Sequence, residues 1–154
     1  MNKMLPLAAF VLCIPVFANA GTCAAPTPLQ SNPSLQDTTC GGEIGINLGG
    51  TIYVHPSNVF SLHLDHAAAM DGVLDPIHLE GTNREMAITT SCKAAPLQVG
   101  GEGLSIELNP LTDGDYLLIV STDPSIPPTN PPICGAFHLF GGWIPVTLQS
   151  FTID

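Results

Sequence analysis

Short apolar segments, broken every few residues by glycine, proline, asparagine or aspartate, constrain this chain more than any other feature. Most of them are β-branched or alternate between apolar and polar residues, which is the period of a half-buried strand. Only LDHAAAM could form a helical turn. The expected strands are TIYVH, NVFSLHLD, VLDPIHLE, EMAITTS, GLSIELN, DYLLIVST, AFHLF and WIPVTLQSFTI. About eight regularly spaced strands predict an all-β antiparallel sandwich, similar to a jelly roll.

Two segments depart from this alternation, and each has a predictable place. DYLLIVS is apolar at consecutive positions, so both of its faces should be buried, as in a central strand. DPSIPPTNPPIC is rich in proline, which cannot donate a hydrogen bond inside a sheet. We therefore expect this second segment to be an extended surface loop.

The N-terminus has the features of a secretory signal peptide. Lys3 precedes the apolar run MLPLAAFVLCIPVF, which is too short to span a bilayer, and ANA follows it. We expect cleavage after Ala20 and a soluble product that is secreted or periplasmic. The predicted organisation is a signal peptide (1–20), an arm rich in Pro, Ser, Thr and Gly (21–49) that holds the first disulfide, and a β-sandwich domain (50–154).

Cysteine usage fits an oxidising compartment. Cys13 leaves with the signal peptide, and four cysteines remain. Four cysteines allow three pairings, and no C-x-x-C spacing indicates a zinc or redox site. We expect Cys23–Cys40, which would hold down the arm, and Cys92–Cys134, which would join two strand ends across a long loop.

The charge balance excludes one class of partner. Without Lys3, two basic residues, Arg84 and Lys93, face thirteen acids, which gives a formal charge of −11. A surface this acidic repels phosphate backbones, so we expect no nucleic-acid binding. No later apolar run is long enough for a membrane helix, so we expect no membrane insertion.

Four segments in this order resemble the bacterial pre-peptidase C-terminal (PPC) domain: NVFSLHLD, MDGVLDPIHLEG, SIELNPLTDGDYLLIVSTDPS and CGAFHLF. The landmarks are a D-x-V-L strand and a turn-Gly-x-Tyr-x-Leu-x-Val strand, here Asp71, Val73 and Leu74, then Gly114, Tyr116, Leu118 and Val120. The resemblance covers about residues 50–140. It implies a secreted β-sandwich of the kind appended to exported enzymes, which acts as an accessory or binding module without catalytic residues.

The stretch FSLHLDHAAAMDGVLDP is the richest in chemical side chains. If NVFSLHLD is a strand, His63 and Asp65 share one face at a spacing that can chelate zinc. Residues that could complete such a site are His66, Asp71, Asp75 and His78. A calcium site would instead use Asp65, Asp71 and Asp75 with backbone carbonyls, although D-G-x-x-D lacks the ligand register of an EF-hand. The simpler interpretation, a strand with a wet face followed by a turn, is the one we favour, and we assign no cofactor.

Catalytic and sugar-binding patterns are sparse. There is no G-x-S-x-G, H-E-x-x-H or phosphate loop, so we predict that the protein is not an enzyme. A hydrolase whose serine and histidine converge only in space remains an alternative. Trp143 is the single candidate for stacking on a carbohydrate. Pro127 and Pro128 could dock a partner in extended form, although we favour a solvated connection held by Cys134.

The function expected from the sequence is that of an exported, non-catalytic interaction or accessory module. Its partner is an unknown protein or glycan, and we expect the protein itself to be a monomer. The main alternative is a cation-dependent (Ca or Zn) binder of a ligand or carbohydrate.

Overall fold

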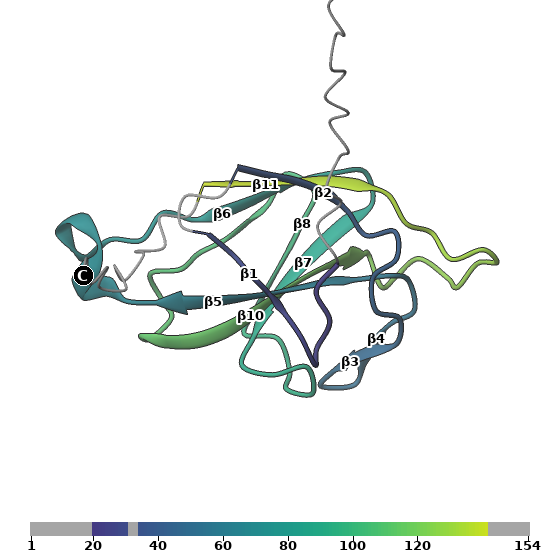
Figure 1. Ribbon diagram of the computed structural model, residues 1–154, viewed down its shortest axis with the longest axis horizontal. Helices are drawn as coiled ribbons and strands as arrows, with labels where there is room; N and C mark the ends of the chain where they lie inside the picture. The colour runs from purple at the N-terminus through teal and green to yellow at the C-terminus, as the bar shows by residue number, and fades with distance from the viewer. Residues whose placement is uncertain (1–19, 31–33, 142–154) are drawn as a thin grey trace, which may run out of the picture.

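Residues 20–30 and 34–141 are described by the structure, a computed structural model, and they form two packed sheets and a separate hairpin (Figure 1). One sheet has five strands in the order β1-β5-β10-β7-β8, and the other has four in the order β2-β11-β6-β9. All strand pairs are antiparallel except β1 with β5. The predicted all-β sandwich with two disulfides is confirmed.

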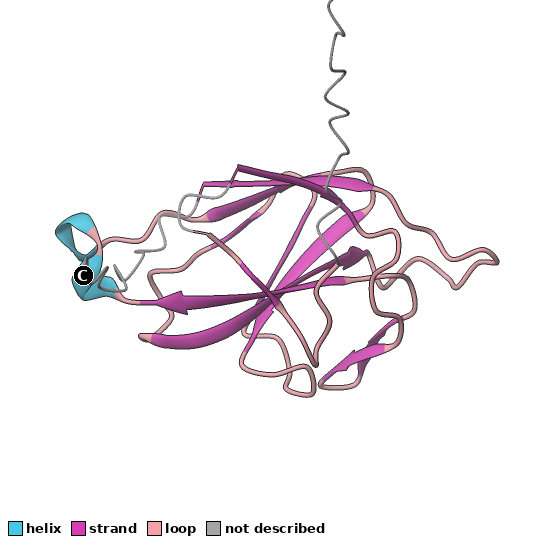
Figure 2. Ribbon diagram, in the orientation of Figure 1, coloured by secondary structure: helices cyan, strands magenta, loops and turns pink. Residues whose placement is uncertain are grey.

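The strands are short, as the spacing of turn residues predicts. The five-stranded sheet contains β1 (Thr27–Pro28), β5 (Asn58–Leu64), β7 (Arg84–Thr89), β8 (Gln98–Gly101) and β10 (Gly114–Thr122). The four-stranded sheet contains β2 (Ser34–Thr38), β6 (Ile77–Glu80), β9 (Ser105–Ile106) and β11 (Ala136–Gly141). The hairpin consists of β3 (Ile46–Leu48) and β4 (Thr51–Tyr53). Two single turns of 3-10 helix, η1 (His66–Ala68) and η2 (Met70–Gly72), follow β5 (Figure 2).

The main core lies between the two sheets. Alternate residues of β5 and β10 point into it, including Phe60, Leu62 and Leu118, and all are almost fully buried. Phe60 meets Phe137 of the opposite sheet edge to face, with ring centroids 6.3 Å apart. β10 pairs with β5 on one side and β7 on the other, so the prediction that DYLLIVS is a central strand is confirmed.

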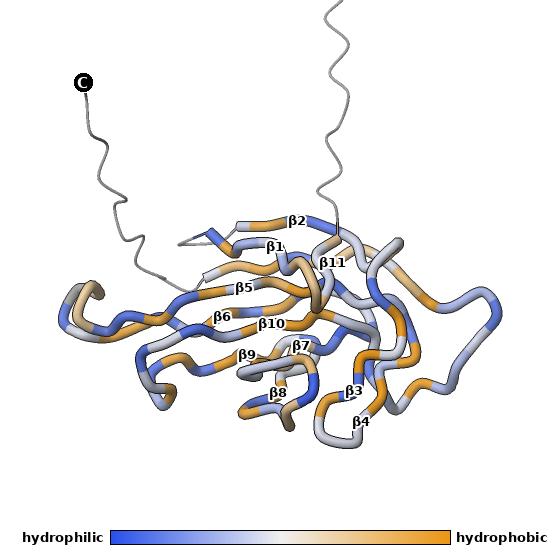
Figure 3. Tube along the Cα trace, turned by 60° about the horizontal axis from the view of Figure 1, so that its bottom comes forward, coloured by the Kyte–Doolittle hydropathy of each residue, from blue (hydrophilic) through white to orange (hydrophobic). Residues whose placement is uncertain are grey.

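A smaller core covers the outer face of the five-stranded sheet. The β3-β4 hairpin packs there, and hydrophobic residues recur along it (Figure 3). Its turn, Gly49-Gly50, has positive φ at both positions, which glycine adopts without steric cost. This second core explains why Ile119 is buried although it points away from the sandwich interior.

Seven of the eight expected strand segments contain an observed strand, and the eighth, 143–153, lies outside the described residues. Four observed strands were not expected: β1, β2, β3 and β8. Three of these come from residues 21–49, the segment expected to be an arm, and β1 and β2 each extend a sheet. No helix among the described residues is long and apolar enough to cross a membrane.

The predicted disulfide pairing is wrong. The structure joins Cys23 to Cys92 and Cys40 to Cys134. Thr38 at the end of β2 is paired with Ala136 at the start of β11, so the cysteines two residues beyond these positions meet. Cys23 and Cys92 instead meet at the second core, where both pack. Tertiary contacts, not closeness along the chain, therefore select the partners.

Candidate functional site

The stretch FSLHLDH, residues 60–66, folds as a strand with a wet face and the start of a capped turn. Leu62 and Leu64 are buried, whereas the side chain of His63 is 54% exposed. Asp65 comes directly after β5, and its carboxylate accepts hydrogen bonds from the backbone N–H groups of Ala67 and Ala68. This is the usual role of an aspartate that precedes a helical turn.

Both histidines of this stretch have carboxylate partners that the sequence analysis did not single out. Nδ1 of His63 lies 2.7 Å from a carboxylate oxygen of Asp115, and Nδ1 of His66 lies 2.5 Å from one of Asp113. The backbone N–H of His66 also donates to Asp113. These bonds from His66 hold the pKa of Asp113 below its usual range.

The remaining predicted metal ligands lie apart from these pairs. Asp71 is exposed in η2 with a positive φ of 61°, and Asp75 is exposed in the connection to β6. His78 lies on β6 and stacks on Phe140 of β11, with ring centroids 5.1 Å apart. Within 20–30 and 34–141, no three His, Cys, Asp or Glu side chains are placed to share a metal ion.

The outer face of the four-stranded sheet brings a serine, a histidine and a glutamate into a row. Ser34 Oγ lies 3.3 Å from Nε2 of His138, and Nδ1 of His138 lies 3.4 Å from a carboxylate oxygen of Glu80. The order of atoms is that of a hydrolase triad. Both distances are long, and the side chain of Glu80 is 66% exposed, so the polarisation of Ser34 is weak.

The proline-rich loop between β10 and β11 has the most distinctive construction. It projects from the end of the molecule opposite to η1 and η2 (Figures 1 and 2). Residues 127–132, PPTNPP, are all exposed, as predicted for this segment. No charged residue lies between Pro124 and Gly135, although the whole chain carries a net charge of −10. The loop therefore presents an uncharged surface on an acidic protein.

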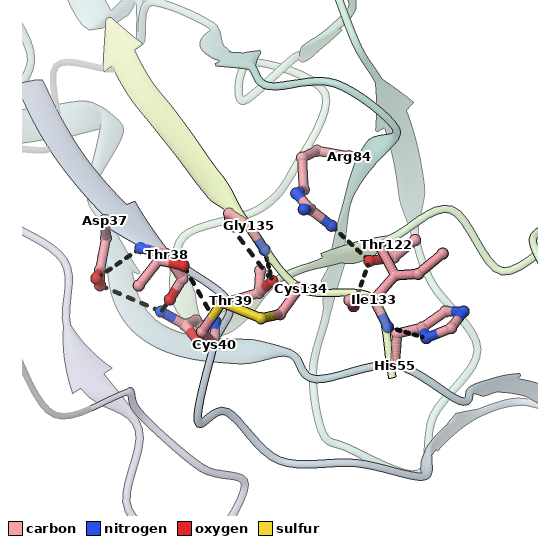
Figure 4. The surroundings of a disulfide bond; sticks show 11 residues. Asp37, Thr38, Thr39, Cys40, His55, Arg84, Thr122, Ile133, Cys134 and Gly135 are labelled. Carbon is pink, nitrogen blue, oxygen red and sulfur yellow. Dashed lines mark hydrogen bonds between the residues drawn. A yellow bond between two sulfur atoms is a disulfide. The ribbon is translucent and has the colours of Figure 1, made fainter. Parts of the chain in front are cut away.

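The C-terminal base of this loop is fixed by a disulfide and by backbone pairing (Figure 4). Cys134 is bonded to Cys40, which follows β2. Beside it, the buried Thr39 donates its N–H to the carbonyl of Gly135 and accepts the N–H of Gly135 at its hydroxyl. Both backbone groups of Gly135, the residue after Cys134, are thus bound to Thr39.

A buried histidine holds both ends of the exposed stretch. His55, between β4 and β5, is 1% exposed. Its Nδ1 accepts the backbone N–H of Ile133 at 3.0 Å, and its Nε2 lies 3.2 Å from the carbonyl oxygen of Pro127. One side chain therefore links the beginning and the end of the proline-rich segment.

Arg84 supports the same base from the opposite side. It is 5% exposed, and its guanidinium donates to the hydroxyl of Thr122, which in turn donates to the carbonyl of Ile133 (Figure 4). Its Nε has no hydrogen-bond partner among the described residues. Burial lowers the pKa of Arg84. A side chain at residue 135 would require this guanidinium to shift.

A second buried polar contact joins the hairpin to β7. The hydroxyl of Tyr53 donates to a carboxylate oxygen of Glu85 at 2.6 Å. Burial, the contact with Glu85 and the charge of Asp123 all raise the pKa of Tyr53. Burial also raises the pKa of Glu85, against the opposing effect of this hydrogen bond.

Comparison of the chain with protein-family models, with curated proteins and with solved structures finds no match. The resemblance to the PPC domain therefore remains an expectation based on its strand motifs. Trp143, the predicted carbohydrate platform, lies outside the described residues.

Sequence reasoning identified the proline-rich loop but missed the residues that hold it. His55 and Arg84 gave no signal, because a lone histidine after a strand and a lone arginine at the start of one have no motif. The charge count offered one indication: Arg84 is one of only three basic residues.

Proposed function

We propose that the protein is an exported, non-catalytic interaction module that presents its proline-rich loop, residues 123–134, to a protein partner. The observation that supports this most is the contrast between an exposed PPTNPP tip and a base built from a disulfide, a buried histidine and a buried arginine. Surface connections are ordinarily variable and mobile, so a loop that is held at its base in this way offers a partner a more fixed surface. The accessory role implied by the resemblance to the PPC domain agrees with this proposal.

Preorganisation gives the loop a physical advantage in binding. Fixing the backbone of a flexible residue costs about 1–2 kcal/mol, and a loop already held at both ends avoids much of that cost when it binds. The tip is ordered further by the hydroxyl of Thr129, which donates to the carbonyl of Pro131. Exposed prolines dock in grooves lined by aromatic side chains, so a groove of this kind is the partner surface we expect.

Photo-crosslinking tests the proposal in the cells that produce the protein. A photoreactive benzophenone amino acid would replace Thr129 at the loop tip or, as a matched control, Val73 at the opposite end; both residues are exposed. We expect a discrete crosslinked product from position 129 that is absent from position 73. The same products from both positions, or none from position 129, would contradict docking through the loop.

The non-catalytic part of the proposal has its own test, because Ser34, His138 and Glu80 lie in the order of a triad. We expect no labelling of Ser34 by a fluorophosphonate, since the long contacts described above activate its hydroxyl poorly. The Ser34→Ala variant is the control. Labelling that disappears in this variant would favour the hydrolase alternative instead.

Thermal unfolding distinguishes the cation-dependent alternative. A ligand at a hundred times its dissociation constant stabilises a protein by about 2.7 kcal/mol. For an interaction module without a metal we expect the same melting temperature in EDTA, calcium and zinc. A rise with one metal that is lost in His63→Ala or Asp65→Ala would favour the cation-dependent binder.

A further inference from the structure

We infer that His55 is an acid-sensitive latch: when neutral it holds both ends of the proline-rich loop, and when protonated it releases them. The inference concerns the regulation of the loop, and only its consequence for binding rests on the proposed function. The argument depends on which atoms surround the imidazole.

The two hydrogen bonds of His55 assign its tautomer. The backbone N–H of Ile133 can only donate, so Nδ1 must offer a lone pair. The carbonyl of Pro127 can only accept, so Nε2 must carry the proton. The structure is therefore compatible only with a neutral imidazole.

Protonation at Nδ1 would remove the acceptor of Ile133. Two N–H groups would then face each other at the 3.0 Å separation of the present bond. Because His55 is 1% exposed, water cannot replace the lost partner while the loop stays in place. A buried donor without a partner and a buried charge are both unfavourable, and both are relieved if the loop base opens.

The charged groups around the latch do not offer an alternative partner to an imidazolium. From β7, Arg84 donates to the hydroxyl of Thr122, which donates to the carbonyl of Ile133, so the charged group linked to the residue that His55 binds is a cation. The acids of the surrounding elements are otherwise engaged: Glu85 accepts from Tyr53 of β4, Asp123 after β10 accepts from Ser125, Asp37 of β2 accepts from Asn58 and Thr38, and Glu43 accepts from Cys23. None of them is a hydrogen-bond partner of His55 within the described part of the chain.

The direction of the pH effect follows from the neutral tautomer. The folded loop base binds the neutral imidazole, so its contribution to the closed state is complete at the alkaline end and is lost as pH falls. Histidine side chains take up protons between about pH 8 and pH 5, which sets the range to examine. Acidification across this range should open residues 127–133 while the sheets remain folded.

Backbone hydrogen exchange of the oxidised protein, followed by NMR, measures the opening directly. We expect the protection of the Ile133 amide, corrected for the intrinsic exchange rate, to fall about tenfold or more on acidification, as for the loss of a buried hydrogen bond and its neighbour. The amide of Leu118 in the central strand is the internal reference and should keep its protection. Imidazole nitrogen shifts of His55 should report the Nε2–H tautomer at neutral pH.

Two substitutions separate the latch from other histidines. In His55→Asn the side-chain oxygen can still accept the N–H of Ile133 but does not titrate, so the pH dependence should disappear. The His138→Asn variant removes an imidazole from the four-stranded sheet, and there the pH dependence of Ile133 protection should persist. An Ile133 amide that is equally protected across the range, or that responds equally in His55→Asn, would overturn the inference.

If His55→Asn does not fold, the wild-type comparison of Ile133 with Leu118 still decides the matter, because a fall at both amides would indicate global unfolding and refute a local latch. Photo-crosslinking at position 129 across the same pH range keeps the two proposals apart. Opening of Ile133 with no crosslinked product at any pH would support the latch and contradict the proposed function. If the Ile133 amide opens but the yield of the crosslinked product stays the same across the pH range, release of the loop does not regulate binding.

Discussion

Replacing both cysteines of the Cys40–Cys134 disulfide by serine should destabilise the protein by about 4 kcal/mol. The bond closes a ring of 94 residues, and loop-closure entropy alone gives about 4.7 kcal/mol for a ring of this length. The ring closed by the second disulfide overlaps this one, so the unfolded variant gains less chain freedom than a ring of 94 residues implies. We therefore take about 4 kcal/mol instead of ~4.7 kcal/mol. Packing adds little, because Cys40 is exposed and Cys134 is only half-buried.

The Cys23–Cys92 disulfide provides the matched comparison. Its ring of 69 residues gives about 4.4 kcal/mol before the same reduction for overlap, slightly less than the ~4.7 kcal/mol of the other ring. However, both of its cysteines are half-buried and pack against the second core, whereas Cys40 is exposed. Serine hydroxyls placed there would be partly shielded from water, and a hydroxyl buried without a partner costs about 1–3 kcal/mol. The double serine variant of this pair should therefore be the less stable of the two, although its ring is shorter.

Equilibrium unfolding in urea measures both variants against the oxidised wild type. The free energies can be compared directly where the denaturant slopes agree, since the slope reports the surface exposed on unfolding. A loss below about 1 kcal/mol for the Cys40–Cys134 variant would refute the loop-closure reasoning. A larger loss for that variant than for the other pair would refute the packing argument.

Three further outcomes can be measured. Trypsin cleaves after Arg84 and Lys93, and from the unreduced protein it should release a single product in which disulfides link three peptides. If mass spectrometry instead finds the N-terminal peptide unlinked to the other two, the cysteines are paired as Cys23–Cys40 and Cys92–Cys134. Glu85→Gln should raise the free energy of unfolding in urea at neutral pH, because burial raises the pKa of Glu85 and the amide oxygen can still accept from Tyr53. This gain should shrink as pH falls, because the wild-type carboxyl is then protonated. An equal or larger gain in acid would contradict the reasoning. Asp113→Asn should lower the stability at neutral pH and flatten the decline of stability in acid. A carboxylate with a depressed pKa stabilises the fold above its unfolded pKa and loses that effect as pH falls through its folded pKa. An unchanged dependence of stability on acid pH would count against this prediction.

Local alternation determined much of what the sequence could predict. The inward face of β5 follows from side chains that repeat every second residue, and the central position of β10 follows from a run of consecutive apolar residues. The surface position of the proline-rich loop follows equally from local chemistry, because proline has no N–H to pair. Seven strand segments were recognised for these reasons.

Three of the four strands that were missed have little local signal. β1 is two residues long and contains a proline, and β8 contains two glycines. β2, with the sequence SLQDT, is largely polar because it lies at the edge of the four-stranded sheet. In each case the neighbouring strand supplies the pairing, so the residues themselves carry no strong preference.

The candidate site shows the same division. The sequence by itself determined that residues 123–134 form a proline-rich surface loop and that four cysteines are available for disulfides. Only the tertiary structure decided which cysteines meet, because the antiparallel pairing of β2 with β11 places Cys40 beside Cys134 across 94 residues. It likewise brought His55 to Ile133, 78 residues further along the chain. Such contacts depend on strand order and register, which are properties of the whole packed chain and leave no pattern in any short segment.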